Sequence, residues 1–174
     1  MKTPRLETER LILRPLSFKD VDNVFLLFSN PNVMKSDMGY VMTDRQEAKD
    51  YIEMSIQDNH NGFVWAIEEK QTGSFIGTGG LKNCYGKLSA EVGLIIDERY
   101  WNKKFGSEAV KKIVEFAFQT LQLSYIYATT LPENHRSIRL LKRLGFRFYG
   151  WTNCYLYANC YVNGFVFIKS KYET

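Results

Sequence analysis

The sequence from Glu91 to Leu121, EVGLIIDERYWNKKFGSEAVKKIVEFAFQTL, reads as a buried strand, a short turn and a helix. Its apolar run at 91–96 is too short for a typical helix and is followed by polar residues, which predicts a strand. After the turn, apolar residues recur at spacings of three and four, as on one helix face: Val110, Ile113, Val114, Ala117 and Leu121. A strand, a tight turn and a helix in this order present free backbone N–H groups and a positive dipole end at one point, which favours phosphate binding.

Two lysines strengthen the phosphate interpretation. Lys103 and Lys104 lie where the helix should begin, and a cation at the positive end of a helix is disfavoured by roughly 0.3–1 kcal/mol. An anion at this point would explain the pair. A solvated pair of lysines in a loop is the alternative, and the strand–turn–helix context favours the anion.

Composition predicts one globular domain. The chain has 174 residues and 45% hydrophobic residues, which is enough for a single core and short for two. No apolar run approaches the ~20 residues of a membrane span, and the N-terminus lacks a signal-peptide core. We therefore expect a cytoplasmic protein with no membrane partner.

Charge and cysteine content exclude several classes of site. A net charge of +4 without a concentrated basic block does not favour nucleic acid, although it tolerates an anionic cofactor. Cys84, Cys154 and Cys160 are odd in number and lack metal-like spacing, which predicts reduced thiols. With only two histidines, we expect no histidine-ligated metal and no Ser-His-Asp triad.

Periodicity along the chain predicts a mixed sheet with helices packed on its faces, an α/β (α+β) class. Seven strands are expected, at 10–16, 63–68, 75–81, 91–96, 125–130, 146–151 and 161–171. Four helices are expected: one capped by Ser17 and Asp20 and stopped by Asn30-Pro31, one opened by Thr43 and Gln46, the central helix, and a short one at 137–144.

Three blocks resemble the GNAT superfamily of acetyl-CoA-dependent N-acetyltransferases. The turn 101–106, WNKKFG, is similar to the family's pyrophosphate-binding turn, Q/R-x-x-G-x-G/A, with Trp often first in the branch that acetylates ribosomal-protein N-termini (RimJ/RimL type). Residues 134–146 resemble that branch's N-x-x-S-x-x-L-L-x-x-x-G-F, and residues 8–16 resemble its T-x-R-L-x-L-R. The blocks occur in the right order and cover nearly the whole chain.

The resemblance implies a fold and a set of site residues. The fold is one N-acetyltransferase domain at residues 8–172, with a mostly antiparallel sheet of six to seven strands, a splayed parallel strand pair and about four helices. Acetyl-CoA would be the acetyl donor. Its pantetheine arm would lie against backbone groups of Leu94, Ile95 and Ile96, and Asn134 would hydrogen-bond it from the opposite wall, a role compatible with capping a helix. Its pyrophosphate would lie on the turn, at Asn102, Lys103, Lys104, Phe105, Gly106 and Ser107.

Two positions depart from the family pattern. Lys104 stands where glycine is usual, so it must either keep an ordinary φ or deform the turn. Leu141 stands where many members carry the tyrosine that protonates the leaving thiolate. In the RimJ/RimL pattern Ser137 is proposed to donate instead, the alternative being a small residue at a crowded helix start.

The acceptor side offers one carboxylate and some aromatic residues. Glu91 is the candidate base, which a neutral attacking amine requires; an exposed strand residue is the alternative. Tyr149, Tyr155 and Tyr157 are candidates for lining the acceptor pocket, the alternative being plain sheet faces.

The acceptor itself is expected to be a protein or peptide N-terminal α-amine. An α-amine has a pKa near 7.8 and lysine near 10.4, so neutral lysine costs roughly 3.5 kcal/mol more at pH 7. A small amine (antibiotic, polyamine or amino acid) is the alternative acceptor. A non-catalytic acyl-CoA-binding module is the alternative function, and the sequence leaves open whether the chain is a homodimer.

Overall fold

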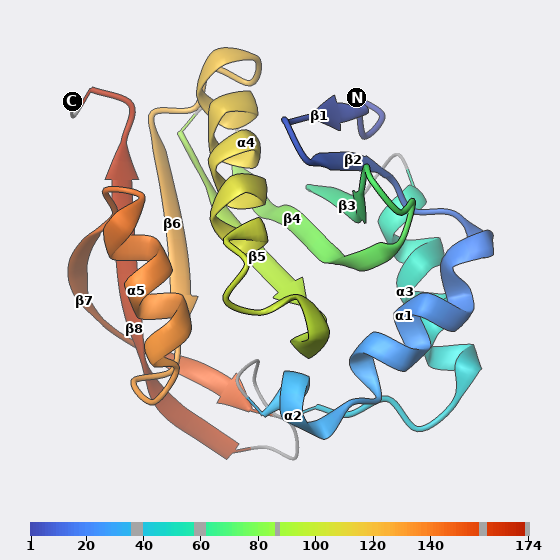
Figure 1. The fold of residues 1–174 in the computed structure, drawn as a ribbon. Coiled ribbons are helices and arrows are strands. Elements are labelled where there is room, and N and C mark those ends of the chain that lie inside the picture. The colour runs from blue at the N-terminus through green and yellow to red at the C-terminus, as the bar shows by residue number, and fades with distance from the viewer. Residues whose placement is uncertain (36–39, 58–61, 86–87, 157–159, 173–174) are drawn as a thin grey trace.

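The computed structural model describes residues 1–35, 40–57, 62–85, 88–156 and 160–172 (Figure 1). In these ranges eight strands form one sheet in the order β1-β2-β3-β4-β5-β6-β8-β7. The strands are β1 (Leu6–Glu7), β2 (Leu11–Pro15), β3 (Phe63–Glu69), β4 (Phe75–Tyr85), β5 (Ser89–Ile96), β6 (Tyr125–Thr130), β7 (Arg147–Leu156) and β8 (Cys160–Ser170). Among them only β5 and β6 pair in parallel. The predicted mixed, mostly antiparallel sheet is confirmed.

One strand more is present than the sequence predicted. It is β1, which pairs through Leu6 and Glu7 with the end of β2 and precedes the expected start of the domain at residue 8. A strand of two residues is too short to show alternation, so periodicity cannot reveal it.

The described helices are α1 (Val21–Phe28), α2 (Pro31–Met34), α3 (Arg45–Ile56), α4 (Phe105–Gln119) and α5 (His135–Arg143), with 3-10 helices η1 (Phe18–Asp20) and η2 (Glu98–Tyr100). The unexpected one is α2. Asn30 accepts a hydrogen bond from the Asn32 N–H at 2.9 Å, and Pro31 follows as the first helical residue. Asn-Pro therefore starts a new helix as well as ending the first, because proline suits a first helical position.

The start of α3 is one residue later than predicted. Asp44, not Thr43, is the N-cap, and its carboxylate accepts hydrogen bonds from the N–H groups of Gln46 (2.7 Å) and Glu47 (3.1 Å). Thr43 instead donates its hydroxyl to the Glu47 carboxylate at 2.7 Å. Both residue types cap helices well, and the sequence alone does not separate neighbouring candidates.

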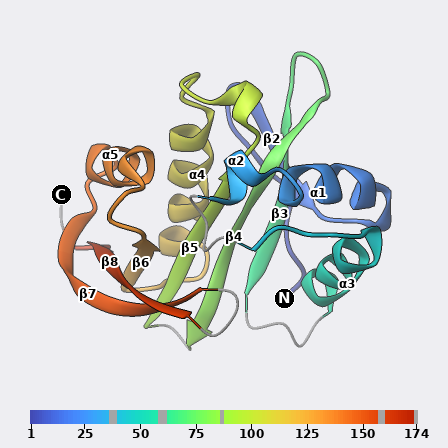
Figure 2. The same cartoon turned by 90° about the horizontal axis from the view of Figure 1, so that it is seen from below.

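Helices cover both faces of the sheet (Figures 1 and 2). Alternate residues of β3 belong to two cores: Trp65 and Ile67 pack in the core that contains α4 and α5, whereas Val64 and Ala66 pack in the core that contains α1, α2 and α3. This alternation places the two helix groups on opposite faces, because successive strand side chains point in opposite directions.

The predicted capping box before the first helix is confirmed and carries a buried charge. Asp20 is 2% exposed and accepts two hydrogen bonds from Arg14, at 2.7 and 2.8 Å, and one from the Ser17 N–H at 2.9 Å. Burial alone would raise the pKa of the Asp20 carboxyl, but the bonds from Arg14 and Ser17 outweigh burial and lower it. The buried Asp20 carboxylate is therefore kept ionised by its hydrogen bonds to Arg14 and Ser17.

The parallel strands separate after three residue pairs. β5 and β6 are in register from Ser89–Tyr125 to Glu91–Tyr127 and are unpaired beyond that point. Figure 1 shows them adjacent at their starts and apart at their ends. Half of the N–H and C=O groups of a strand face each neighbour, so the part of β5 after Glu91 directs such groups into the gap. The expected splayed pair is confirmed.

None of the helices in the described ranges is long and apolar enough to cross a membrane.

Candidate functional site

A cavity of about 400 Å³ lies where β5 and β6 separate. The ends of both strands, the turn before α4, the first turn of α4 and one side of α5 surround it. It brings together most of the residues that the sequence singled out: Glu91, Leu94, Ile95, Ile96, Asn102, Lys104, Phe105, Gly106, Ser107, Asn134 and Ser137. Residues up to 46 positions apart in the sequence thus meet at one point, as a binding site requires.

Lys103 is the exception among the predicted site residues. It is not among the residues around the cavity, and its ammonium lies 5.1 Å from the centre of the Tyr100 ring. Its carbonyl oxygen accepts a hydrogen bond from Arg10 at 3.2 Å. A direct role of Lys103 at the site stays a prediction.

The backbone of the turn has the shape that glycine would allow. Lys104 has φ +65° and ψ +6°, and Asn102 has φ +64°, both in the left-handed region. Of the two outcomes that the sequence left open for Lys104, an ordinary φ or a deformed turn, the first is wrong. A left-handed conformation costs a non-glycine residue roughly 1–2 kcal/mol, so the turn holds Lys104 against a local preference.

The start of α4 has free N–H groups. Its first helical hydrogen bond runs from the Glu108 N–H to the Lys104 carbonyl at 3.1 Å, so the amides before Glu108 have no acceptor within the helix. Side chains of Asn30, Asp44 and Asn134 cap α2, α3 and α5, whereas Lys104 offers no such cap to α4. Uncapped amides at a positive helix end suit a phosphate group.

Gly106 lets the start of α4 approach the sheet and α5. A Cβ at this position would lie 3.0 Å from Leu94 Cδ2 and 3.2 Å from Leu140 Cδ1, so both leucine side chains would have to shift by a few tenths of an ångström. The glycine therefore favours close packing of the start of α4, with its free amides, beside β5.

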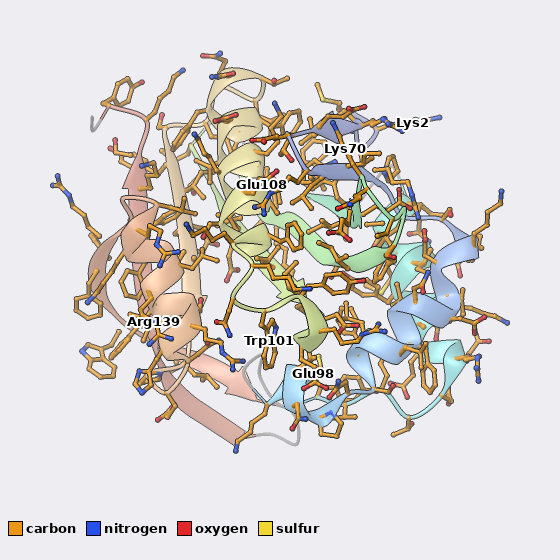
Figure 3. The ribbon with its side chains drawn as sticks, in the orientation of Figure 1. Lys2, Lys70, Glu98, Trp101, Glu108 and Arg139 are labelled. Carbon is orange, nitrogen blue, oxygen red and sulfur yellow. The ribbon has the colours of Figure 1, made fainter. Side chains whose placement is uncertain are left out.

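The N-terminal block holds the turn from the other side. The Glu108 carboxylate accepts hydrogen bonds from the Thr8 hydroxyl, the Arg10 N–H (2.9 Å) and the Arg10 guanidinium (2.8 Å). The Arg10 guanidinium carbon also lies 4.6 Å from the centre of the Phe105 ring. Figure 3 shows Glu108 on the side of α4 that faces β1 and β2. Burial raises the pKa of Glu108, but the bonds from Thr8 and Arg10 lower it further, to below its ordinary value.

Trp101 joins the end of β5 to the start of α5. Its indole N–H donates to the Ile96 carbonyl at 2.7 Å, and the Arg136 guanidinium carbon lies 3.8 Å from its ring centre. A cation over an indole face is a favourable contact. Trp101 therefore fixes α5 relative to the turn at the open end of the splayed strands.

Two hydroxyl groups line the cavity, one at the start of α5 and one at the end of β6. Asn134 accepts a hydrogen bond from the Ser137 N–H at 3.1 Å, so the expected helix cap is present. Ser137 is half-buried and lines the cavity. Thr130, at the end of β6, is 6% exposed, and its hydroxyl has no hydrogen-bond partner in the described structure. Leu141 is 3% exposed and belongs to the core, so it supplies no proton donor.

Glu91 lies on the sheet face opposite α4. Its neighbours Ala90 and Val92 belong to the core under α4, so the side chain between them points to the other face. The Asn83 amide donates to the Glu91 carboxylate at 3.3 Å and to the Tyr127 hydroxyl at 3.4 Å. The Asn83 amide thus bridges a carboxylate and a phenol where the strands begin to separate.

Other sequence candidates lie elsewhere. Tyr149 is 77% exposed on the edge strand β7 and is not among the residues around the cavity. The side chain of Tyr155 and the whole of Tyr157 fall outside the described residues. Cys84 is a half-buried free thiol whose pKa burial raises, while Cys154 and Cys160 have side chains outside the described part. Within that part, no group of three or more His, Cys, Asp or Glu residues has metal-binding geometry.

Sequence reasoning missed three arginines at the cavity. Arg136, Arg139 and Arg143 of α5 all line it. Their spacing of three and four residues is visible in the sequence and places them on one helix face. Which way that face points depends on how α5 packs, so the sequence did not identify them.

These features fit a ligand with phosphate groups and a long polar arm. A family model for the acetyltransferase (GNAT) domain matches residues 10–147. This chain belongs to the GNAT family. The uncharacterized N-acetyltransferase YoaA of Bacillus subtilis (strain 168) is 34% identical over 162 residues, which is 90% of each chain. The protein is therefore an acetyltransferase, with acetyl-CoA as acetyl donor.

Solved structures share the acetyltransferase fold. A GNAT-family acetyltransferase from Bacillus anthracis is 23% identical, with a TM-score of 0.87 over 98% of this chain and 100% of that one. Spermidine N-acetyltransferase from Vibrio cholerae, solved with CoA and spermine, is 22% identical, with a TM-score of 0.81 over 94% and 97% of the two chains. At these identities the likeness supports the fold alone.

Proposed function

We propose that this acetyltransferase acetylates the α-amine at the N-terminus of a protein or peptide, as in the RimJ/RimL branch that its three sequence blocks resemble. The observation that carries the proposal is the scarcity of carboxylates around the cavity. Among the described residues there, Glu91 is the single carboxylate, so a second positive charge on the acceptor would find no partner of opposite charge. An acceptor with one amine and no further positive charge fits such a site.

The proposed cofactor site combines backbone and side-chain groups. Acetyl-CoA, when bound, supplies a thioester carbonyl that an amine attacks, so that a C–N bond forms and the C–S bond breaks. Leu94, Ile95 and Ile96 offer backbone groups in the gap beside β6, and Asn134 lies across it. The free amides before Glu108 would hold the pyrophosphate, together with the turn residues Asn102, Lys103, Lys104, Phe105, Gly106 and Ser107. The acetyltransferase domain is proposed to extend over residues 8–172, because the sheet continues to Ser170, and β1 at Leu6–Glu7 adds a short edge strand before it.

Two residues would move protons. Glu91 would accept a proton from the incoming ammonium, directly or through water, because only a neutral amine is nucleophilic. Tyr127 and Asn83 support this role, since the Asn83 amide bonds both Glu91 and the Tyr127 hydroxyl and so holds the two groups at the point of strand separation. Ser137 would donate a proton to the departing thiolate, a role that buried Leu141 cannot take.

Acceptor basicity also favours an α-amine. Deprotonating a lysine at pH 7 costs roughly 3.5 kcal/mol more than deprotonating an α-amine, and the site offers one carboxylate to offset this cost. The small-amine alternative, an antibiotic, polyamine or amino acid, is most concrete for polyamines because spermidine N-acetyltransferase shares the fold. A polyamine carries several positive charges, however, and among the described residues around the cavity only Glu91 could pair with one of them. The cytoplasmic location stays a prediction.

A matched peptide panel tests the acceptor. Purified protein and acetyl-CoA are incubated with peptides that have a free N-terminus and no lysine, the same peptides with a blocked N-terminus and one lysine, and spermidine. We expect mass spectrometry to detect acetylation, with release of free CoA thiol, only for the free N-termini. Faster acetylation of spermidine or of the blocked lysine peptides would overturn the proposal. Glu91→Gln should abolish most of the activity while acetyl-CoA binding persists.

A further inference from the structure

The charged residues that give the net charge of +4 are unevenly distributed along the sequence. Between Glu133 and Glu173 the sequence contains seven lysines and arginines and no acidic residue. Four of these cations lie on α5, and a fifth, Arg147, begins β7. The C-terminal part of the molecule is therefore strongly cationic, and the cavity borders on it.

The cations of α5 divide into two sets. Arg136, Arg139 and Arg143 line the cavity, whereas Lys142, on the same helix, does not. Arg136 already has a neighbour, since its guanidinium lies over Trp101. Arg139 and Arg143 are exposed, and within the described residues neither has a hydrogen bond or ion pair. Figure 3 marks Arg139 on α5 and Trp101 at the turn before α4.

Two unpaired arginines one helical turn apart destabilise a helix through like-charge repulsion. Four residues correspond to a rise of about 6 Å, so both planar guanidinium groups can reach the same small anion from adjacent turns. Arginine also presents donors in a fork that matches phosphate oxygens. The pair is therefore suited to a dianionic phosphate that reaches the cavity mouth.

The cofactor carries two separate phosphate groups. The free amides at the start of α4 and the side chain of Lys104 are already assigned to the pyrophosphate. The second group is a monoester on the ribose 3′-oxygen, with a charge of about −1.5 to −2 near pH 7, like other phosphate monoesters. Neither the α4 amides nor Lys104 remains available for it, whereas Arg139 and Arg143 have no other partner among the described residues.

We propose that Arg139 and Arg143 form a subsite for the 3′-phosphate of CoA, by which the enzyme distinguishes CoA from dephospho-CoA. The inference rests on the placement of the cofactor given under the proposed function, but not on the identity of the acceptor. The two guanidinium groups bind and orient the nucleotide end of the cofactor and take no part in acetyl transfer. Arg136, held on Trp101, borders the subsite.

The test measures binding without turnover. Isothermal titration at low salt compares CoA with dephospho-CoA on the parent protein, on Arg139→Gln, on Arg143→Gln and on the double variant. Lys142→Gln is the matched control, because it removes one charge from the same helix outside the cavity. Melting temperatures without ligand check that every variant is folded, and removal of like charges should leave them unchanged or slightly higher.

We expect the parent and Lys142→Gln to bind CoA at least 10-fold more tightly than dephospho-CoA. In the double variant this ratio should fall to 3-fold or less, through loss of CoA affinity with dephospho-CoA affinity almost unchanged. A parent that does not distinguish the two ligands, or a double variant that keeps the parent's ratio, would overturn the subsite. If the arginines served an acidic acceptor instead, the ratio would stay constant across all variants. No acceptor is present, so these outcomes are independent of the peptide panel.

Discussion

Arg10 and Glu108, 98 residues apart in the sequence, form a hydrogen-bonded ion pair at the start of α4, with an Nε–Oε2 distance of 2.8 Å. The same guanidinium donates to the Lys103 carbonyl at 3.2 Å. The block at residues 8–16 is thus more than an opening strand. Its arginine fixes both the helix whose amides face the cavity and the turn before that helix.

Glu108→Gln should weaken acetyl-CoA binding although Glu108 lies outside the cavity wall. The amide cannot accept from Thr8 and Arg10 as the carboxylate does, so the turn loses part of its support. We expect a 3- to 10-fold higher dissociation constant for acetyl-CoA by titration, with an almost unchanged kcat. Glu115→Gln, on the same helix and away from the turn, is the control. If Glu108→Gln and Glu115→Gln bound acetyl-CoA with equal affinity, Glu108 would contribute to the stability of the fold and not to cofactor binding.

Two variants at Lys104 distinguish the effect of its backbone conformation from the effect of its charge. Lys104→Gly relieves the left-handed conformation and should raise the free energy of unfolding by about 0.5–1 kcal/mol, whereas Lys104→Ala keeps a Cβ and should give no such gain. Both variants lose the ammonium and should bind acetyl-CoA about 3- to 10-fold more weakly. Denaturant unfolding and titration check the two effects. Equal stability of the glycine and alanine variants would mean that the turn relaxes in solution.

The contrast between Lys103 and Lys104 shows what the sequence can predict at this site. The position of the turn followed from residues 101–106, because the periodicity on either side and the family pattern agree. The two side chains diverge, however: Lys104 borders the cavity and Lys103 lies on Tyr100. Their directions follow from left-handed φ values at positions 102 and 104, which neither Asn nor Lys requires and which the sequence therefore does not reveal.

The missed parts of the fold and site have similar causes. The two-residue β1 and the four-residue α2 are shorter than the periods that reveal strands and helices. The arginines of α5 were visible as a face, but its direction is set by Leu141 and its neighbours in the core. The strand separation, by contrast, was foreseeable only through resemblance, since no local pattern indicates where a parallel pair stops.

Ser137→Ala should lower the maximal rate more than cofactor affinity. A proton donor acts mainly in the transition state, and thiolate leaves fairly well unaided, so a 10- to 100-fold lower kcat is expected. The dissociation constant of acetyl-CoA should change less than 3-fold by titration. Ser137→Cys, which retains a donor, should recover part of the rate. If Ser137→Ala turned over as fast as the parent, the serine would serve only the packing at the helix start.

Acid should weaken the fold through Asp20. The folded-state pKa of Asp20 is lowered, so its contribution to stability is complete above its unfolded pKa of about 3.9 and disappears as the pH falls through the folded value. Asp20→Asn should therefore cost about 1–3 kcal/mol at pH 7, and this difference should shrink below about pH 4. Asp22→Asn is the control, because its pair with Arg45 is exposed and worth little. Denaturant unfolding between pH 3 and 7 measures both. If the difference in unfolding free energy between the parent and Asp20→Asn did not change with pH, Asp20 would not stabilise the fold through its charge.

Thr130→Val should move stability and binding in opposite directions. The Thr130 hydroxyl is buried without a partner in the described structure, and an unsatisfied buried hydroxyl costs about 1–3 kcal/mol. Valine has nearly the same shape, so the ligand-free variant should unfold at a higher denaturant concentration than the parent. If the hydroxyl bonds the arm of the cofactor, the same change should raise the dissociation constant of acetyl-CoA about 3- to 10-fold. Thr152→Val, on β7 and not among the residues around the cavity, should do neither. A gain in stability with unchanged affinity would show that the Thr130 hydroxyl does not contact the cofactor.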